Sequence, residues 1–206
     1  ANGQSVTLTT IGKPIGAFYG YVTDGIFQNQ ADLNSYPRLP QAGIGDLKFK
    51  DINGDGVING NDRTYLGSPI PDFVYGVNID LNWRGWDFSL GLQGVYGNKL
   101  FNGKNVVRPD PYNFEAHVWD RWTGEGTSNS EPRPSFGGYN FLPSDRFIHD
   151  GSYLRVRSLI LGYTLPSQVA SRVGMTNARF YLKANNLYTL TSYSGYTPEI
   201  GSGDVL

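Results

Sequence analysis

The clearest pattern in the chain is an alternation of apolar and polar side chains along two neighbouring stretches. Every odd position of residues 73–83 is apolar, and every even position of residues 86–92 is apolar. A period of two predicts β-strands with one apolar and one polar face, and the two-residue connection Arg84–Gly85 predicts a tight hairpin. The sequence therefore predicts a long antiparallel hairpin here.

Further strands are predicted at residues 147–165 and 179–190, with a weaker one at residues 5–10. In the first of these, Leu154 and Val156 fall on one face and Leu159, Leu161 and Tyr163 on the other. A change of phase inside one strand predicts a β-bulge near Ser158. Two short helical segments are expected at residues 113–122 and 166–174, the second between a proline and a glycine.

An apolar sheet face has two ordinary uses, and the chain's loops and strand lengths bear on the choice. It packs on a second sheet in a soluble sandwich, or it faces lipid in an outer-membrane barrel. The predicted strands are about ten residues long, against about 5–6 in globular sheets, and Trp83 and Trp86 at the hairpin end suit a membrane interface. Short connections alternate with long ones at residues 20–72, 101–145 and 192–206, which is typical of barrels with long extracellular loops.

Composition supports an all-β protein and excludes some partners. The chain has 27 glycines, 14% aromatic and 17% charged residues, a mixture that suits strands and turns. Its net charge of −1 offers no basic surface for nucleic acid, so we expect no nucleic-acid partner. There is no cysteine, which excludes disulfides and thiolate metal sites within this chain.

Residues 51–62, DINGDGVINGND, carry the most specific local motif. Loops of this type place oxygen ligands for Ca²⁺ at positions 1, 3, 5, 7, 9 and 12, with a glycine at position 6 for the sharp turn. The predicted ligands are Asp51, Asn53, Asp55, the carbonyl of Val57, Asn59 and Asp62. The last is shorter than the usual glutamate, as in dockerin-type loops. The same residues also make turns without a metal, so both readings stay open.

Several longer motifs, taken in order, resemble the SusC/RagA family of TonB-dependent outer-membrane transporters. They are GKPIGAFYGYVTDGIFQ (12–28), GDLKFKDINGDGVINGNDRTYLG (45–67), QGVYGNKLFN (93–102), RW and PR (121–122, 132–133), DGSYLRVRSLILGYTLP (150–166) and ARFYLKANNLYTLTSYSGYTPE (178–199). His149 departs from the acidic residue that relatives commonly carry before DGSYLR.

The resemblance implies a C-terminal part of such a transporter. Members of the family form a 22-stranded barrel in the outer membrane of Gram-negative bacteria, closed by an N-terminal plug that contacts TonB. They pair with a SusD-like surface lipoprotein and import glycans, oligosaccharides or peptides. On this basis residues 1–206 are expected to be barrel, without the plug and the final strand, and residues 45–67 and 101–145 are expected to be extracellular loops.

Catalysis has little support in the sequence, so we expect no enzyme. The carboxylates of the long loop, Asp110, Glu115, Asp120 and Glu125, have no fixed separation, and neither His117 nor His149 lies in a nucleophile motif. Loop aromatics offer stacking surfaces for a sugar or a lid, or else pack the loops against each other; they are Tyr112, Phe114, Trp119, Trp122, Tyr139 and Tyr196. The alternative to a transporter segment is a secreted, calcium-stabilised β-sandwich that binds carbohydrate.

Overall fold

The structure is a computed structural model, and it describes residues 4–103, 115–135 and 138–199. The chain divides into two compact units. The first comprises Ala1–Ile70 and Lys99–His149, and the second comprises Pro71–Asn98 and Asp150–Leu206. Strands outnumber helices among the described elements and make up most of the second unit, in agreement with the predicted all-β class. None of the helices in the described residues has the length and apolar character needed to span a membrane.

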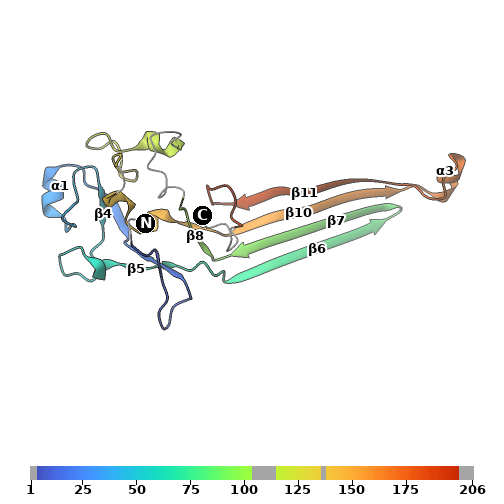
Figure 1. Cartoon of the computed structure of the whole chain (residues 1–206). Coiled ribbons are helices and arrows are strands. Elements are labelled where there is room, and N and C mark those ends of the chain that lie inside the picture. Colours follow the sequence, from blue (N-terminus) through green and yellow to red (C-terminus); the bar gives the residue numbers. More distant parts are fainter. Residues whose placement is uncertain (1–3, 104–114, 136–137, 200–206) are drawn as a thin grey trace. The chain divides into compact units, whose positions relative to one another are not determined.

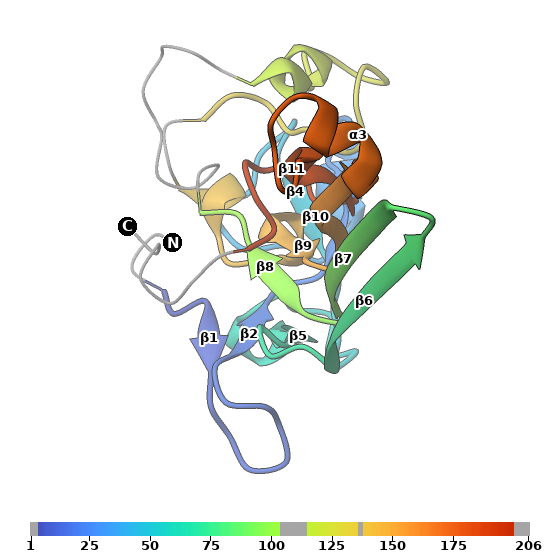
Figure 2. The same ribbon diagram turned by 90° about the vertical axis from the view of Figure 1, so that its right-hand side faces the viewer.

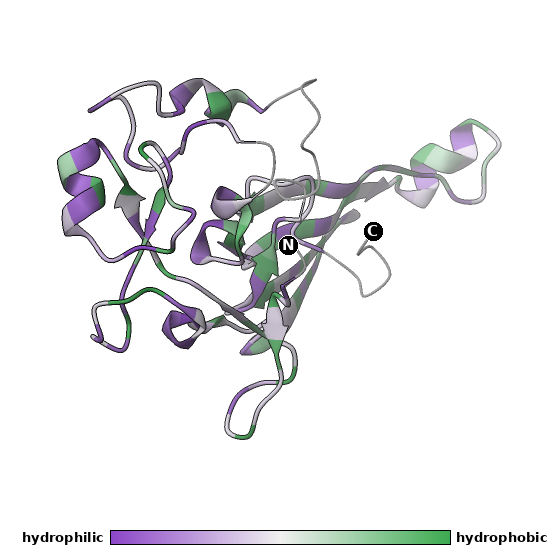
Figure 3. Cartoon of the chain, turned by 60° about the vertical axis from the view of Figure 1, so that its left-hand side comes forward, coloured by the Kyte–Doolittle hydropathy of each residue, from purple (hydrophilic) through white to green (hydrophobic). Residues whose placement is uncertain are grey.

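The second unit is built on a four-stranded antiparallel sheet in the order β11-β10-β7-β6 (Figure 1). Its strands are β6 (Phe73–Trp83), β7 (Trp86–Tyr96), β10 (Tyr153–Thr164) and β11 (Arg179–Thr191). They contain between 11 and 13 residues, about twice the usual length of a globular strand. Hydrophobic and hydrophilic residues alternate along them (Figure 3).

The β6–β7 hairpin has the predicted register. Trp83 pairs with Trp86 across the turn, and the ladder continues without interruption to Phe73 and Tyr96. Arg84 and Gly85 adopt φ values of 47° and 87°, the left-handed pair of a two-residue hairpin turn. A Cβ on Gly85 would lie 2.8 Å from the carbonyl oxygen of Thr164. This position therefore requires glycine both for its positive φ and for its lack of a side chain.

A bulge interrupts β10, as predicted. Val156 pairs with Leu92 and Ser158 with the next residue of β7, Gly91, so that Arg157 is the extra residue. The consequence differs from the expectation that the apolar residues occupy opposite faces. Because Leu159 pairs with Leu90, two residues from Leu92, the bulge returns the apolar side chains after it to the face of Val156.

Helix α3 (Ser167–Arg172) connects β10 to β11 and confirms the expected helical turns. Pro166 precedes it, and Gly174 follows with φ 76°, the left-handed conformation that ends helices.

The first unit contains three small sheets. Strands β1 (Thr7–Leu8), β2 (Ala17–Gly20) and β5 (Thr64–Gly67) form a three-stranded sheet (Figure 2), and β3 (Thr23–Ile26) pairs with β4 (Leu47–Phe49). Strand β8 (Lys99–Phe101) pairs with β9 (Ile148–Asp150). The helical elements are α1 (Gln30–Ser35) and the 3₁₀ turns η1 (Gly60–Asp62), η2 (Ala116–Asp120), η3 (Tyr139–Phe141) and η4 (Asp145–Phe147).

A small apolar core lies around the β3–β4 pair. Its buried members are Tyr21, Ile26, Leu47, Phe49 and Ile58, and Trp122 and Tyr139 pack against it from the long loop. Burying side chains of this size stabilises a fold by about 1.5–3 kcal/mol each. The core therefore lies between the β3–β4 pair and the long loop that contributes Trp122 and Tyr139.

The helix expected at residues 113–122 is shorter than predicted. Residues 104–114, which include Phe114, lie outside the described part, and the remainder forms the 3₁₀ turn Ala116–Asp120. Trp122 lies past its end, in extended chain, because its N–H donates to the carbonyl of Glu131 at 2.8 Å. This bond between two loop segments replaces a further helical turn.

Candidate functional site

The loop from Asp51 to Asp62 is curled around its own carboxylates. Asp51 accepts the N–H groups of Gly54 and Gly56, both at 2.7 Å, and Asp55 accepts that of Val57 at 2.9 Å. Gly54 and Gly56 have φ values of 75° and 79°, which permit the tight path. These bonds hold the pKa of Asp51 below its usual range, chiefly through the Gly56 N–H.

The end of the loop is fastened to its beginning by Asp62. This residue is fully buried, and its two oxygens accept the N–H groups of Ile52 at 3.0 Å and Asn59 at 2.7 Å. Asn59 caps the turn Gly60–Asp62 in return. The carboxyl of Asp62 lies near that of Asp51 and adds to the lowering of the Asp51 pKa. Asp62 is therefore a buried clamp within the loop.

The fit of this loop to Ca²⁺ is partial. It brings carboxylates of Asp51 and Asp62 together and keeps Asn53 beside Asp55, with Asn53 Nδ2 donating to Asp55 Oδ2 at 2.8 Å. Across residues 4–103, 115–135 and 138–199, however, no three His, Cys, Asp or Glu side chains form a group that could hold a metal. Ligation would thus depend on the amide and carbonyl oxygens of Asn53, Val57 and Asn59 as well.

A buried ion pair that the sequence reading missed joins the long loop to β4. Asp46, 2% exposed, accepts hydrogen bonds from Arg133 Nε at 2.7 Å and Arg133 Nη2 at 3.0 Å. Gly43 N–H and Asn140 Nδ2 donate to the same carboxylate, each at 2.9 Å. Asp46 raises the pKa of Arg133 in turn. The carboxylate is thus fully satisfied, which is what allows its burial.

The RW and PR motifs meet around Gly45. A Cβ on Gly45 would lie 2.6 Å from Trp122 Cε3 and 3.0 Å from Arg133 Cδ, so only glycine lets both side chains cross it. Trp122 Nε1 donates to Gln28 Oε1 at 3.1 Å. These contacts give Trp122 and Arg133 a packing role. Both pairs, RW and PR, were among the motifs of the family resemblance, but their sequence alone did not indicate that they meet at Gly45.

The other predicted contact aromatics differ in exposure. Trp119 is 83% exposed and Tyr196 is 93% exposed, so both side chains lie largely in solvent. Tyr139 lies 5.2 Å from Phe49, centroid to centroid, as part of the core. Tyr112 lies outside the described residues. Among the predicted contact aromatics of the first unit that the structure describes, Trp119 is the one that suits a partner, since Trp122 and Tyr139 pack against the core.

The two histidines have different surroundings. His117 Nδ1 is 3.4 Å from Glu115, and its Nε2 is 3.9 Å from Glu131, which also pairs with Arg146. His149 lies in β9, where burial lowers its pKa. The contacts of His117 are with carboxylates, and the expected absence of catalysis stays a prediction.

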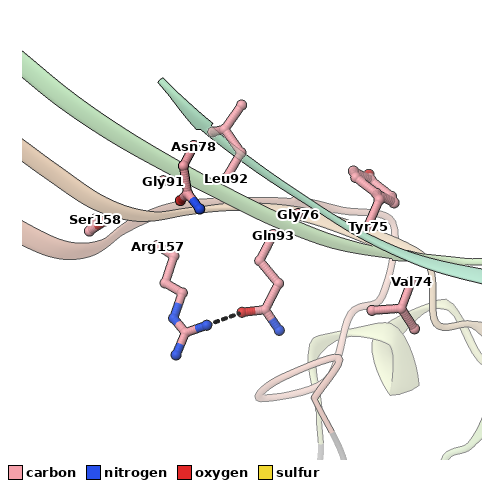
Figure 4. A pocket seen from close by; sticks show the side chains of 9 residues that line it. All are labelled: Val74, Tyr75, Gly76, Asn78, Gly91, Leu92, Gln93, Arg157 and Ser158. Carbon is pink, nitrogen blue, oxygen red and sulfur yellow. Dashed lines mark hydrogen bonds between the residues drawn. The ribbon is translucent and has the colours of Figure 1, made fainter. Parts of the chain in front are cut away.

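The polar face of the sheet has a shallow hollow beside the bulge (Figure 4). Arg157 donates to Gln93 at 3.2 Å, and both side chains project to one side of the strands while Leu92 projects to the other. A Cβ on Gly91 would lie 2.6 Å from Ser158 Oγ, so the glycine makes room for that hydroxyl. Arg155 pairs with Glu199 and donates to Thr189 at 2.8 Å.

Aromatic side chains border the apolar face at both ends. The register aligns Trp83, Trp86, Tyr163 and Phe180 in one row across the four strands, and the rings of Trp86 and Tyr163 lie 4.7 Å apart. At the opposite end, Phe73 stacks on Tyr96 at 5.1 Å. The predicted interface pair Trp83 and Trp86 is therefore part of a larger row, to which Tyr163 and Phe180 belong.

Comparison with known proteins gives consistent matches. No family model matches the chain. It is 32% identical to the TonB-dependent receptor P3 of Formosa agariphila over 194 residues, covering 91% of this chain and 19% of that receptor. It is 31% identical to receptor P26 of the same organism, covering 96% and 20%, and 26% identical to the TonB-dependent receptor SusC of Bacteroides thetaiotaomicron, covering 98% and 19%.

A solved structure gives the same result for the fold. The RagAB peptide transporter matches with a TM-score of 0.73 at 21% identity, covering 97% of this chain and 21% of that chain. The chain thus spans about a fifth of the length of the proteins it matches. These matches confirm the resemblance to SusC/RagA-type receptors that the sequence motifs predicted.

Proposed function

We propose that this chain, a fragment of a SusC/RagA-like transporter, supplies wall strands and extracellular loops to a 22-stranded outer-membrane barrel that imports nutrients. Since its relatives are receptors and a transporter, a role in uptake rather than catalysis is the function that the similarity favours. The imported solutes of the family, glycans or peptides, are the substrate classes to test.

The apolar face of the β6–β7–β10–β11 sheet carries this proposal. Between Phe73 and Trp83, which border the apolar face, β6 places Tyr75, Val77, Ile79 and Leu81 on that face. From Phe73 to Trp83 there are ten residue steps, or about 33 Å at about 3.3 Å each. A tilt of about 40° leaves about 25 Å across the membrane, which matches the apolar band of about 25 Å in such barrels.

The exposed apolar side chains and open edges of this sheet support a segment that is completed by further strands and lipid. On the apolar face, Leu81, Phe180 and Leu182 are 59%, 66% and 76% exposed. Within the described residues, β6 and β11 are each hydrogen-bonded on one side, so each has an open edge. Open edges and a bare apolar face are liabilities in water, and barrel closure in lipid removes both. A secreted carbohydrate-binding sandwich is not favoured by the relatives found.

We also propose that residues 45–67 and 101–145 lie on the extracellular side, where a SusD-like lipoprotein closes over them. The Asp46–Arg133 pair and Trp122 would make this surface stiff, while Trp119 would contact the lid. Replacing Trp119 with a photo-crosslinking residue in the full-length receptor should capture the lipoprotein. The same residue at Tyr139, which packs in the core, should not, and equal capture from both positions would contradict the assignment.

Calcium in the Asp51–Asp62 loop remains a proposal, supported by its ligand spacing and by the juxtaposed carboxylates of Asp51 and Asp62. A bound ion would neutralise this pair and tie the loop more tightly to the turn Gly60–Asp62. Its role would be structural.

The transporter assignment is tested by fractionation of the native membranes. The full-length receptor should sediment with the outer membrane, resist extraction by alkaline carbonate and need detergent for release. Recovery in the soluble or secreted fraction would contradict the proposal and favour the alternative, a secreted β-sandwich.

A further inference from the structure

The three-stranded sheet of the first unit carries two cations on two facing tyrosines. Tyr19 of β2 pairs directly with Tyr65 of β5. The Arg63 guanidinium lies 4.7 Å from the centre of the Tyr19 ring, and Lys13 Nζ lies 4.9 Å from that of the Tyr65 ring. Directly paired residues have Cβ atoms about 5 Å apart, so the sheet brings two positive charges to one place.

A hollow of about 200 Å³ opens between these groups. Its polar lining consists of Thr10, Lys13, Tyr19, Arg63, Thr64 and Tyr65. Sites for drug-sized ligands measure about 300–1,000 Å³, so this hollow suits a small group rather than an oligosaccharide. The loop at residues 9–16, which joins β1 to β2, supplies Lys13 (Figure 2).

The positive charges lack carboxylate partners within the described residues. Lys13 has the Tyr65 ring, and Arg63 Nη2 donates to the carbonyl oxygens of Ser5 and, at 3.0 Å, Tyr19. The neighbouring carboxylate, Asp62, is turned toward the N–H groups of Ile52 and Asn59. Arg63 Nε is buried and has no acceptor among the described atoms. A buried guanidinium donor without an acceptor is costly, and so is a pair of like charges.

We propose that this hollow binds a small oxyanion, of the class of phosphate, sulfate or a carboxylate group. An oxyanion between Lys13 and Arg63 would relieve their repulsion and offer acceptors to both. The threonine hydroxyls would add hydrogen bonds, and the tyrosine rings would exclude water from the charges. The proposal is independent of the transport assignment.

Titration calorimetry of the full-length receptor in detergent, at constant ionic strength, tests the site. Inorganic phosphate, inorganic sulfate and acetate are titrated separately, which distinguishes a tetrahedral anion from a carboxylate. Lys13→Met keeps the aliphatic stem over Tyr65 and should weaken binding at least tenfold. The matched control is Lys50→Met, because Lys50 is also a half-exposed lysine of the first unit, 3.8 Å from Asp24 and outside the hollow.

Binding of one of the three anions that falls in Lys13→Met and not in Lys50→Met supports the site. Arg63→Gln should show the same loss if its fold is intact by circular dichroism. Two results overturn the proposal: no binding of any of the three anions to the wild-type receptor at 10 mM, or binding that Lys13→Met leaves unchanged.

Discussion

The ion pair between Asp46 and Arg133 offers the sharpest stability prediction. Replacing Arg133 by Ala leaves a carboxylate that is 2% exposed without its cation. Removing one partner of a buried pair costs about 3–5 kcal/mol. Because the Arg133 side chain is 45% exposed and two other donors remain on Asp46, we expect about 2 kcal/mol.

Hydrogen exchange in the full-length receptor measures this loss locally. The reporting amides are Leu47 N–H, bonded to Asn140 at 3.0 Å, and residue 133 N–H, bonded to the Gly45 carbonyl at 2.8 Å. A loss of about 2 kcal/mol corresponds to about 30-fold faster exchange at these amides. Lys50→Ala, which removes a pair at 3.8 Å with both side chains more than 40% exposed, is the control and should change exchange less than about threefold.

A double variant separates charge from shape. Asp46→Asn together with Arg133→Gln removes both charges, and should recover part of the protection, because no ion is then left buried alone. Exchange within about threefold of wild type in Arg133→Ala would refute the claim that this pair holds the long loop on β4.

The remaining predictions concern Gly45 and the Asp51–Asp62 loop. Gly45→Ala and Gly12→Ala both place alanine at positive φ, 86° and 81°, but only the alanine at residue 45 would overlap Trp122. Hydrogen exchange should therefore show that Gly45→Ala destabilises the first unit by about 2 kcal/mol more than Gly12→Ala. Equal effects would contradict a steric overlap with Trp122. The double variant Asp51→Ala with Asp55→Ala should lose bound calcium, as measured by mass spectrometry of the metal content. The control variant Asp120→Ala should retain it. Unchanged calcium in the double variant would mean that the loop is a turn that binds no metal. The lowered pKa of Asp51 means that its carboxylate stabilises the loop above the unfolded pKa of about 3.9 and loses this effect as the pH falls through the folded value. Exchange at Gly54 and Gly56, corrected for the intrinsic rate, should therefore accelerate below about pH 4, and a flat profile from pH 6 to pH 3 would contradict the hydrogen bonds to Asp51.

The sheet was predictable because its information is local. Alternation with a period of two fixes the faces of β6 and β7, and Arg84–Gly85 fixes their register. The phase change near Ser158 predicted the bulge, but whether it separates or reunites the apolar faces depends on the partner register with β7, which one strand's sequence does not contain.

The first unit was less predictable because distant side chains hold it. Asp46 and Arg133 are far apart in the sequence, and only the folded loop brings them together around Gly45. The same holds for Trp122, whose backbone N–H bonds to the distant carbonyl of Glu131 in place of the predicted helical turn, and whose indole donates to Gln28. In the Asp51–Asp62 loop the spacing predicted the curl, while the burial of Asp62 as a clamp depends on tertiary packing.

The direct test of the central proposal is the environment of neighbouring side chains on β6. Spin labels at Leu81, on the apolar face, and at Asp80, on the polar face, are compared in the full-length receptor in outer-membrane vesicles by collision with oxygen and with a polar nickel complex. A lipid-facing wall predicts that the label at residue 81 collides with oxygen and is shielded from nickel, and that the label at residue 80 shows the reverse. Shielding of residue 81 from both reagents would place a second sheet on this face and contradict the barrel.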